Sequence, residues 1–182
     1  MVKSFIVIAL KTEANSIINH FDLVQIEDKY FDIYKNENIF LIISKMGVIN
    51  SAVATTYLLT KYKSKKEDKV INIGICGSNR DNYNIGDIFL INKIVDMNSK
   101  KVFHLENGNY SISCYEKPQL VKTDFADMES VGFYMSAKKF IDKKNIFIVK
   151  IVSDYMCEKI PSSKFIDELF QKQLQKIESF IR

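Results

Sequence analysis

The stretch KVINIGICG, residues 69–77, decides the fold. It is a continuous apolar run that ends in two glycines, Gly74 and Gly77. A strand of this composition is typical of a parallel sheet, because helices on both faces of the sheet bury both sides of the strand. The run therefore predicts a central, fully buried strand with a glycine-containing loop at its carboxyl end.

Similar apolar runs recur along the chain and alternate with patterns typical of helices. Predicted strands are SFIVIAL (4–10), YFDIYKN (30–36), IFLIISK (39–45), IGDIFLINKIV (85–95) and NIFIVKIVSDY (145–155), and KVFHLENGNYSISC (101–114) predicts a hairpin with Asn107-Gly108 as its turn. One predicted helix follows Thr12 as its cap. Three others cover residues 47–62, Met128 to about Ile141, and 162–181. The last of them has an apolar stripe formed by Ile166, Leu169, Phe170, Leu174, Ile177 and Ile181.

Alternation of strands and helices predicts an α/β fold in which residues 1–182 form a single domain. We expect a three-layer sandwich whose central sheet is mostly parallel or mixed. In such sheets, ligands bind beyond the carboxyl ends of the strands. Those ends are ALKTE (9–13), GICGSN (74–79) and VSDY (152–155).

The charge of the chain is mildly basic, with a formal net charge of +4, and almost all of it comes from lysine. The densest run, KSKKEDK (63–69), contains Glu67 and Asp68 and no aromatic residue. This favours a solvated helix end over a nucleic-acid surface. The two arginines are Arg80 and Arg182, so bidentate partners for a carboxylate are scarce.

Three separated cysteines, Cys76, Cys114 and Cys157, form no CxxC pair and favour a reducing cytoplasm with buried thiols. The two histidines lack metal-ligand spacing, so we expect no metal and no cofactor. The start, MVKSFIVIAL, predicts a first strand and not a signal peptide. No apolar run approaches the roughly 20 residues of a membrane span, so we expect no membrane partner.

The stretch FADMESVGF (125–133) places two carboxylates at the start of a predicted helix. Glu129 lies four residues before Phe133 and so heads the inward face, whereas Asp127 points nearly the opposite way and is the predicted outward-facing cap. Glu129 either interacts with the helix dipole or needs a buried partner. A ligand with two hydroxyls would satisfy it.

Other catalytic motifs are absent. GICGSN is neither a GxGxxG fingerprint nor a P-loop, and the chain has no GxSxG elbow. Cys76 has no histidine paired with it in the sequence, which favours a buried small hydrophobic residue over a nucleophile.

Five segments resemble, in order, the nucleoside phosphorylase/nucleosidase superfamily. IVIALKTEA (6–14) resembles its first strand and helix, SKMGVINSAVATTYLL (44–59) its SGIGKVAAA segment, and VINIGICGSNRDNYNIGDIFLI (70–91) its glycine loop and GD strand. DMES (127–130) resembles its EMEA ribose motif and IVSDY (151–155) its ISD/VSD base-site motif. The nearest resemblance is to methylthioadenosine/S-adenosylhomocysteine nucleosidases, which implies a phosphorylase/hydrolase-like fold.

The resemblance also implies roles for individual residues. Met128 and Glu129 would hold the ribose, Asp154 would be the general acid that protonates the purine at N7, and Glu13 would orient and deprotonate the attacking water. The substrate would also contact Ser153, Tyr115 as a candidate for the purine-stacking aromatic residue, and the loop residues Gly74, Ile75, Cys76 and Gly77. Without the resemblance, Asp154 and Ser153 could equally cap the next turn.

The implied function is a purine nucleoside N-ribosyl hydrolase that uses water. Phosphorylases of the family place an arginine and a loop serine where this chain has Asn72 and Ile75, which disfavours the alternative of a nucleoside phosphorylase. The segment between NKIVDMN (92–98) and SISCYEK (111–117) is shorter than in the family. A catalytically impaired nucleoside-binding protein is therefore a further alternative, and a homodimer is a possible assembly.

Overall fold

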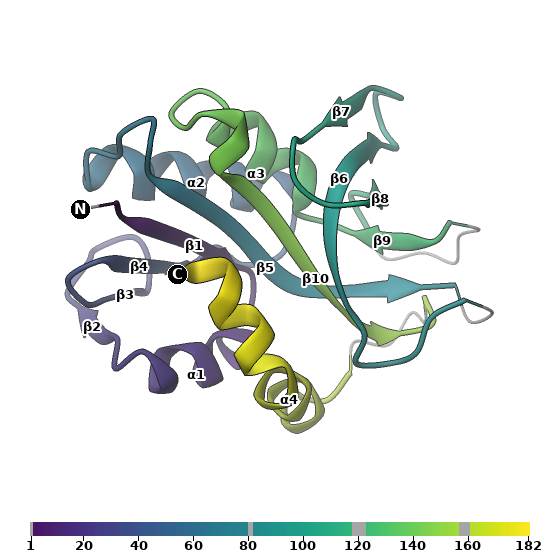
Figure 1. Ribbon diagram of the computed structural model, residues 1–182, viewed down its shortest axis with the longest axis horizontal. Helices are drawn as coiled ribbons and strands as arrows, with labels where there is room; N and C mark the ends of the chain where they lie inside the picture. Colours follow the sequence, from purple (N-terminus) through teal and green to yellow (C-terminus); the bar gives the residue numbers. More distant parts are fainter. Residues whose placement is uncertain (1, 80–81, 118–122, 157–160) are drawn as a thin grey trace.

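The computed structural model describes residues 2–79, 82–117, 123–156 and 161–182, and their strands form one ten-stranded mixed sheet. Its centre is parallel: β1 (Ser4–Ile8) lies between β4 (Ile39–Ile43) and β5 (Lys69–Ser78), and β10 (Ile146–Asp154) lies on the other side of β5. Helices cover both faces of this sheet (Figure 1). The predicted α/β fold with a mixed central sheet is confirmed.

The helices form two separate layers. α1 (Lys11–His20) and α4 (Ser163–Ile181) pack together on one face, and α2 (Val48–Lys61) and α3 (Ser130–Ala137) pack together on the other (Figure 1). A short 3-10 helix, η1 (Lys143–Asn145), precedes β10. The predicted stripe of α4 faces the core: Ile166, Leu169, Phe170, Ile177 and Ile181 are buried, and Leu174 is partly buried. Each face of the sheet thus has its own apolar core.

One side of the sheet ends in antiparallel strands. β3 (Ile33–Lys35) pairs with β4 as the sequence predicts, and β2 (Val24–Ile26) pairs with β3 at the edge. The sequence did not predict β2, because its residues are largely exposed and show no buried pattern.

On the other side, β5, β10, β6 (Ile88–Asp96), β8 (Tyr110–Cys114) and β9 (Phe125–Asp127) close into a ring of paired strands. The predicted hairpin over 101–114 is wrong. β7 (Val102–His104) pairs antiparallel with β6, and β8 pairs parallel with β6. Gly108 has φ +99°, and a Cβ there would lie 2.4 Å from the Leu90 carbonyl oxygen. The turn therefore packs against β6 and carries the chain across it.

Two predicted helix starts also need correction. α1 begins at Lys11 with Leu10 as its N-cap, so Thr12 lies inside the first turn and is not the cap. α3 begins at Ser130 and ends at Ala137, whereas the sequence predicted a helix from Met128 to about Ile141. Asp127 belongs to β9 and not to a helix.

The packing of α3 on α2 depends on one glycine. A Cβ on Gly132 would lie 1.9 Å from the Val48 carbonyl oxygen and 3.1 Å from the Ala52 nitrogen. No side chain can occupy this position unless the helices move apart. The close approach brings the first turn of α3 next to Gly47, the N-cap of α2.

Candidate functional site

The candidate site lies at the carboxyl ends of the parallel strands, and Glu13 stands where β1 stops. The last paired residues of β1 and β5 are Val7 and Asn72, so β5 extends beyond its neighbour. The Ile75 amide of β5 donates to Glu13 Oε1 at 2.8 Å, and the Leu10 amide donates to Oε2 at 2.8 Å. Glu13 therefore takes the place of a β1 residue as the partner of the Ile75 amide. The two amides hold both of its carboxylate oxygens in fixed positions.

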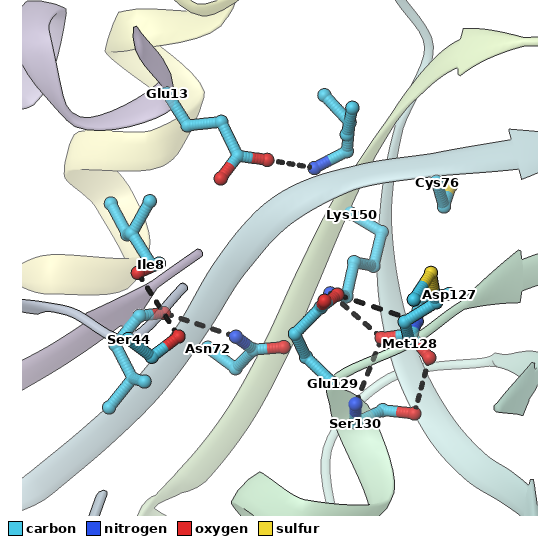
Figure 2. Close-up of polar contacts among 12 residues, drawn as sticks. Ile8, Glu13, Ser44, Asn72, Cys76, Asp127, Met128, Glu129, Ser130 and Lys150 are labelled. Atoms are coloured by element: carbon cyan, nitrogen blue, oxygen red, sulfur yellow. Dashed lines mark hydrogen bonds and ion pairs between the residues drawn. The ribbon is translucent and has the colours of Figure 1, made fainter. Parts of the chain in front are cut away.

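A buried lysine occupies the neighbouring position in β10. Lys150 pairs in register with Gly74, and its Nζ lies 2.8 Å from Asp127 Oδ2 and 3.9 Å from Glu129 Oε2. A Cβ on Gly74 would lie 3.3 Å from Glu13 Oε1 and 3.4 Å from Lys150 Nζ. The bare glycine thus lets the carboxylate and the ammonium approach the same point. We call Glu13, Asp127, Glu129 and Lys150 the Lys150 cluster (Figure 2).

Glu129 joins the two helices of its layer. Its Oε1 accepts a hydrogen bond from the Gly47 amide at 3.0 Å, and its Oε2 lies 3.4 Å from the Met128 amide nitrogen. Gly47 has φ +109°, a conformation that L residues rarely adopt. Glu129 is buried, so its predicted inward orientation is confirmed.

The predicted orientation of Asp127 is wrong. Asp127 is buried, pairs with Lys150, and accepts hydrogen bonds from the amide (3.0 Å) and hydroxyl (2.7 Å) of Ser130. The N-cap of α3 is Glu129 and not Asp127, although Asp127 accepts a hydrogen bond from the amide of Ser130, the first residue of the helix. Helical periodicity misplaced it because residues 125–127 form a strand, in which Phe125 and Asp127 share one face.

Sequence reasoning missed Lys150 as the partner of these carboxylates. Because the chain has few arginines, the sequence argument proposed a ligand as the partner of Glu129. The signal was present in NIFIVKIVSDY, where one lysine interrupts an otherwise apolar strand. A cation at the centre of a buried strand needs a carboxylate partner, since an unpaired buried charge is costly.

Burial sets the protonation of the cluster. Burial raises the pKa of Glu13 to about 7, although the Ile75 and Leu10 amides and Lys150 lower it. Burial also raises the pKa of Glu129, with Lys150 opposing. Burial alone would lower the pKa of Lys150, but Asp127 and Glu129 raise it above its usual range. The lysine therefore stays charged, and Glu13 can gain or lose a proton near neutral pH.

Asp154 is the last residue of β10, and a bulge between Val152 and Asp154 precedes its pairing with Gly77. The Ser153 hydroxyl lies 2.7 Å from Asp154 Oδ2, and a Cβ on Gly77 would lie 3.2 Å from Asp154 Oδ1. Gly74 and Gly77 were predicted in a loop but lie within β5, and they admit one carboxylate each, Glu13 at Gly74 and Asp154 at Gly77. Both acids lie at the same end of the parallel strands.

The other predicted site residues, which include Met128, Ile75, Cys76 and Tyr115, have different environments. Met128 is half-buried and precedes Glu129, and Ile75 contributes its amide while its side chain packs on the α1 and α4 core. Cys76 is buried, and burial raises the pKa of its thiol far above the usual range, which suits an inert thiol. The Tyr115 side chain lines a separate pocket of about 410 Å³ with Met97 and Lys117.

Two residues of the sequence argument, Arg80 and Cys157, lie outside the described residues. Among the residues that are described, no group of three or more His, Cys, Asp or Glu side chains could hold a metal ion. Within the same part of the chain, no helix is both long and apolar enough to cross a membrane.

A comparison with known protein families tests the resemblance that the five sequence segments suggest. The family model described as the Phosphorylase superfamily matches residues 4–122. This chain belongs to the phosphorylase superfamily. A search of curated proteins finds no match to this superfamily member.

Solved structures share the fold of this phosphorylase-superfamily chain over nearly its whole length. The 5′-methylthioadenosine/S-adenosylhomocysteine nucleosidase of Helicobacter pylori has a TM-score of 0.81 and 17% identity over 100% of this chain and 98% of its own. Helicobacter pylori futalosine hydrolase has 0.82 and 16% over 99% and 97%, and Arabidopsis thaliana 5′-methylthioadenosine nucleosidase has 0.80 and 16% over 100% and 96%. At such identities, the likeness demonstrates the fold.

Proposed function

We propose that this phosphorylase-superfamily member is a purine nucleoside N-ribosyl hydrolase of the methylthioadenosine/S-adenosylhomocysteine nucleosidase type. The observation that carries the proposal is the buried Glu13 carboxylate at the carboxyl ends of the parallel strands. The Leu10 and Ile75 amides hold its two oxygens, and burial raises its pKa to about 7. A general base works best when its pKa lies near the operating pH. Structural neighbours named as nucleosidases and as a futalosine hydrolase support the same reaction class.

The reaction needs an acid and a base at opposite ends of one bond. As the bond between C1′ of the sugar and the purine nitrogen breaks, Asp154 donates a proton to N7 of the departing purine. The water oxygen bonds to C1′, and Glu13 accepts the proton that this water releases. Positive charge develops on the sugar, and preorganised carboxylates stabilise such charge. The Ser153 hydroxyl orients the acid through its contact with Asp154 Oδ2.

The sugar would bind beside α3. Glu129 keeps its Oε1 on the Gly47 amide, and each carboxylate oxygen can accept more than one hydrogen bond. It would accept the 2′ and 3′ hydroxyls, with Met128 against the sugar. The backbone of Gly74, Ile75, Cys76 and Gly77 would form the floor of this site. Tyr115, the sequence candidate for the base contact, lines the separate pocket with Met97 and Lys117 and has no role in this proposal.

The charge of the Lys150 cluster favours water over phosphate as the acceptor. Three carboxylates surround a single ammonium, and that ammonium is already paired with Asp127 and Glu129. A phosphate dianion would meet surplus negative charge there. Arg182, the one arginine among the described residues, lines a pocket of about 580 Å³ with residues such as Ser4 and Asn36, at the opposite end of the strands.

We further propose that the chain folds as a single domain over residues 1–182 and acts in the cytoplasm on a small-molecule nucleoside. We propose that it binds no nucleic acid, because its lysines are interspersed with acids. A homodimer is the assembly that we propose for it.

The test is a base-release assay with purified protein. Methylthioadenosine, S-adenosylhomocysteine, adenosine and inosine are incubated with and without phosphate, and free base is followed by chromatography. We expect release without phosphate, and we expect Glu129→Gln to lower kcat/KM by about 100-fold or more. The exposed Glu67→Gln is the matched control and should match the wild type. Release that requires phosphate, or full activity of Glu129→Gln, would contradict the proposal.

A further inference from the structure

Asn72 carries a buried carboxamide that the chain satisfies on one side only. It lies in the middle of β5, between β1 and β10, with 1% of its surface exposed. Its Nδ2 donates to the Val7 carbonyl oxygen at 3.1 Å. No described residue donates a hydrogen bond to its Oδ1. A buried acceptor without a donor is uncommon and calls for an explanation.

The orientation of this carboxamide is fixed by its neighbour in β1. Rotating the amide by half a turn would place Oδ1 against the Val7 carbonyl oxygen and would lose the existing bond. The amide oxygen therefore points away from β1. Figure 2 shows it on the side of Glu129, at the edge of the Lys150 cluster.

The groups around this oxygen do not supply the missing donor. Glu129 in its ionised form is an acceptor as well, and its Oε1 already receives the Gly47 amide. The Lys150 ammonium pairs with Asp127 at 2.8 Å and lies 3.9 Å from Glu129. An ammonium carries three N–H groups, but no hydrogen bond joins Lys150 Nζ to Asn72 Oδ1. Among the described residues, Asn72 Oδ1 is thus an acceptor without a donor on the side of Glu129, and an O–H group of a bound molecule would supply the missing donor.

We propose that Asn72 is a specificity-determining residue whose Oδ1 accepts a hydrogen bond from an O–H group of a molecule bound beside Glu129. The inference rests on the proposed function, and in that setting the donor is either a sugar hydroxyl or the attacking water. Both are neutral donors.

The test replaces the carboxamide by an apolar group of similar shape. Asn72→Leu removes the acceptor, and Asn72→Ala is the second variant should leucine disturb the strand. Asn36→Leu makes the same chemical change at an amide whose Nδ2 and Oδ1 are both bonded, at the far end of the strands. This control should lose stability but keep its activity and its affinity for nucleosides.

Kinetics with adenosine, 2′-deoxyadenosine and 3′-deoxyadenosine separate the two donors. If a sugar hydroxyl is the donor, Asn72→Leu lowers kcat/KM about 10-fold for adenosine but leaves unchanged the deoxynucleoside that lacks that hydroxyl. If water is the donor, all three substrates lose equally, and the ratio of methyl riboside to ribose formed in dilute methanol changes. A merely structural role would not alter that ratio.

Two results would overturn the inference: unchanged kinetics in both Asn72 variants, or an equal loss for all three substrates with an unchanged methanol ratio. If the wild type releases no base, the proposed function fails, and calorimetric titration with the same three nucleosides tests Asn72 independently. Weaker binding that depends on one hydroxyl supports the inference. Equal affinity of Asn72→Leu and wild type for all three nucleosides contradicts it.

Discussion

Replacing Lys150 by methionine tests whether the Lys150 cluster holds the site together. The lysine side chain and its partner Asp127 are each 1% exposed, and their charged atoms are 2.8 Å apart. Methionine has a similar length but leaves Asp127, Glu129 and Glu13 without their cation. Removing one partner of a buried ion pair typically costs about 3–5 kcal/mol, because the remaining charge stays desolvated. For a chain of this length, each kcal/mol lowers the Tm by about 2–4 °C.

The loss should depend on pH in a defined direction. Without the ammonium, the folded-state pKa values of Glu13 and Glu129, which burial already raises, rise further above their unfolded values. The folded variant then binds more protons than its unfolded state, so its stability falls as the pH rises. Lys150 has a raised pKa and stays charged between pH 5 and 8, so the wild type keeps this contribution throughout. Urea unfolding at pH 5 and pH 8 should show a larger difference between variant and wild type at pH 8.

The matched control is Lys93→Met, which changes a half-buried lysine of the neighbouring strand β6. It should alter the free energy of unfolding by about 0.5 kcal/mol or less at both pH values. The reasoning is refuted if Lys150→Met loses less than about 1 kcal/mol at pH 8, or if its loss is the same at both pH values.

Three further results follow from the geometry. The kcat/KM of the wild type should rise with pH through about 7 as Glu13 loses its proton, and Glu13→Gln should remove this limb and lower kcat/KM about 10²–10⁴-fold. Gly132→Ala should cost about 3 kcal/mol or more in urea unfolding, since its Cβ would lie 1.9 Å from the Val48 oxygen; a stability near wild type would contradict the packing argument. Asp154→Asn should lower kcat on adenosine about 10²–10⁴-fold but spare 4-nitrophenyl riboside, whose leaving group needs no proton; an equal loss on both would exclude an acid role.

Much of the fold could be predicted because its strands are buried on both faces. The run KVINIGICG became β5, at the centre of the parallel strands, and the apolar stripe of 162–181 became α4. The inward position of Glu129 was predictable as well, from its spacing to Phe133. In each case, a local pattern reported which side of the element the core covers.

The arrangement around β6 could not be predicted in the same way. Asn107-Gly108 has the composition of a hairpin turn, and a local pattern cannot show that β6 inserts between β7 and β8. The pairing of Lys150 with Asp127 has the same origin, since the two residues come from different strands. The spacing of residues along the chain does not predict a contact between two strands that are distant in sequence.

Glu13 shows a third limit. Its carboxylate caps the first turn of α1 through the Leu10 amide and also receives the Ile75 amide of β5. The resemblance assigned it a catalytic role, but the reason for its position is structural: β1 ends before β5 does. Only the register of the two strands shows that the Ile75 amide lies beyond the last residue paired with β1 and can donate a hydrogen bond to Glu13.

The most direct measurement of the central claim follows the oxygen that enters the sugar. Adenosine or methylthioadenosine is incubated with the purified protein in ¹⁸O-labelled water that contains unlabelled phosphate, and the released sugar is analysed by mass spectrometry. The account predicts free sugar that carries ¹⁸O at C1 above the level that the same free sugar gains by exchange with the labelled water, with Glu13→Gln forming it far more slowly. Recovery of the sugar as an unlabelled 1-phosphate, or labelling that proceeds at the same rate in Glu13→Gln, would contradict hydrolysis at this site.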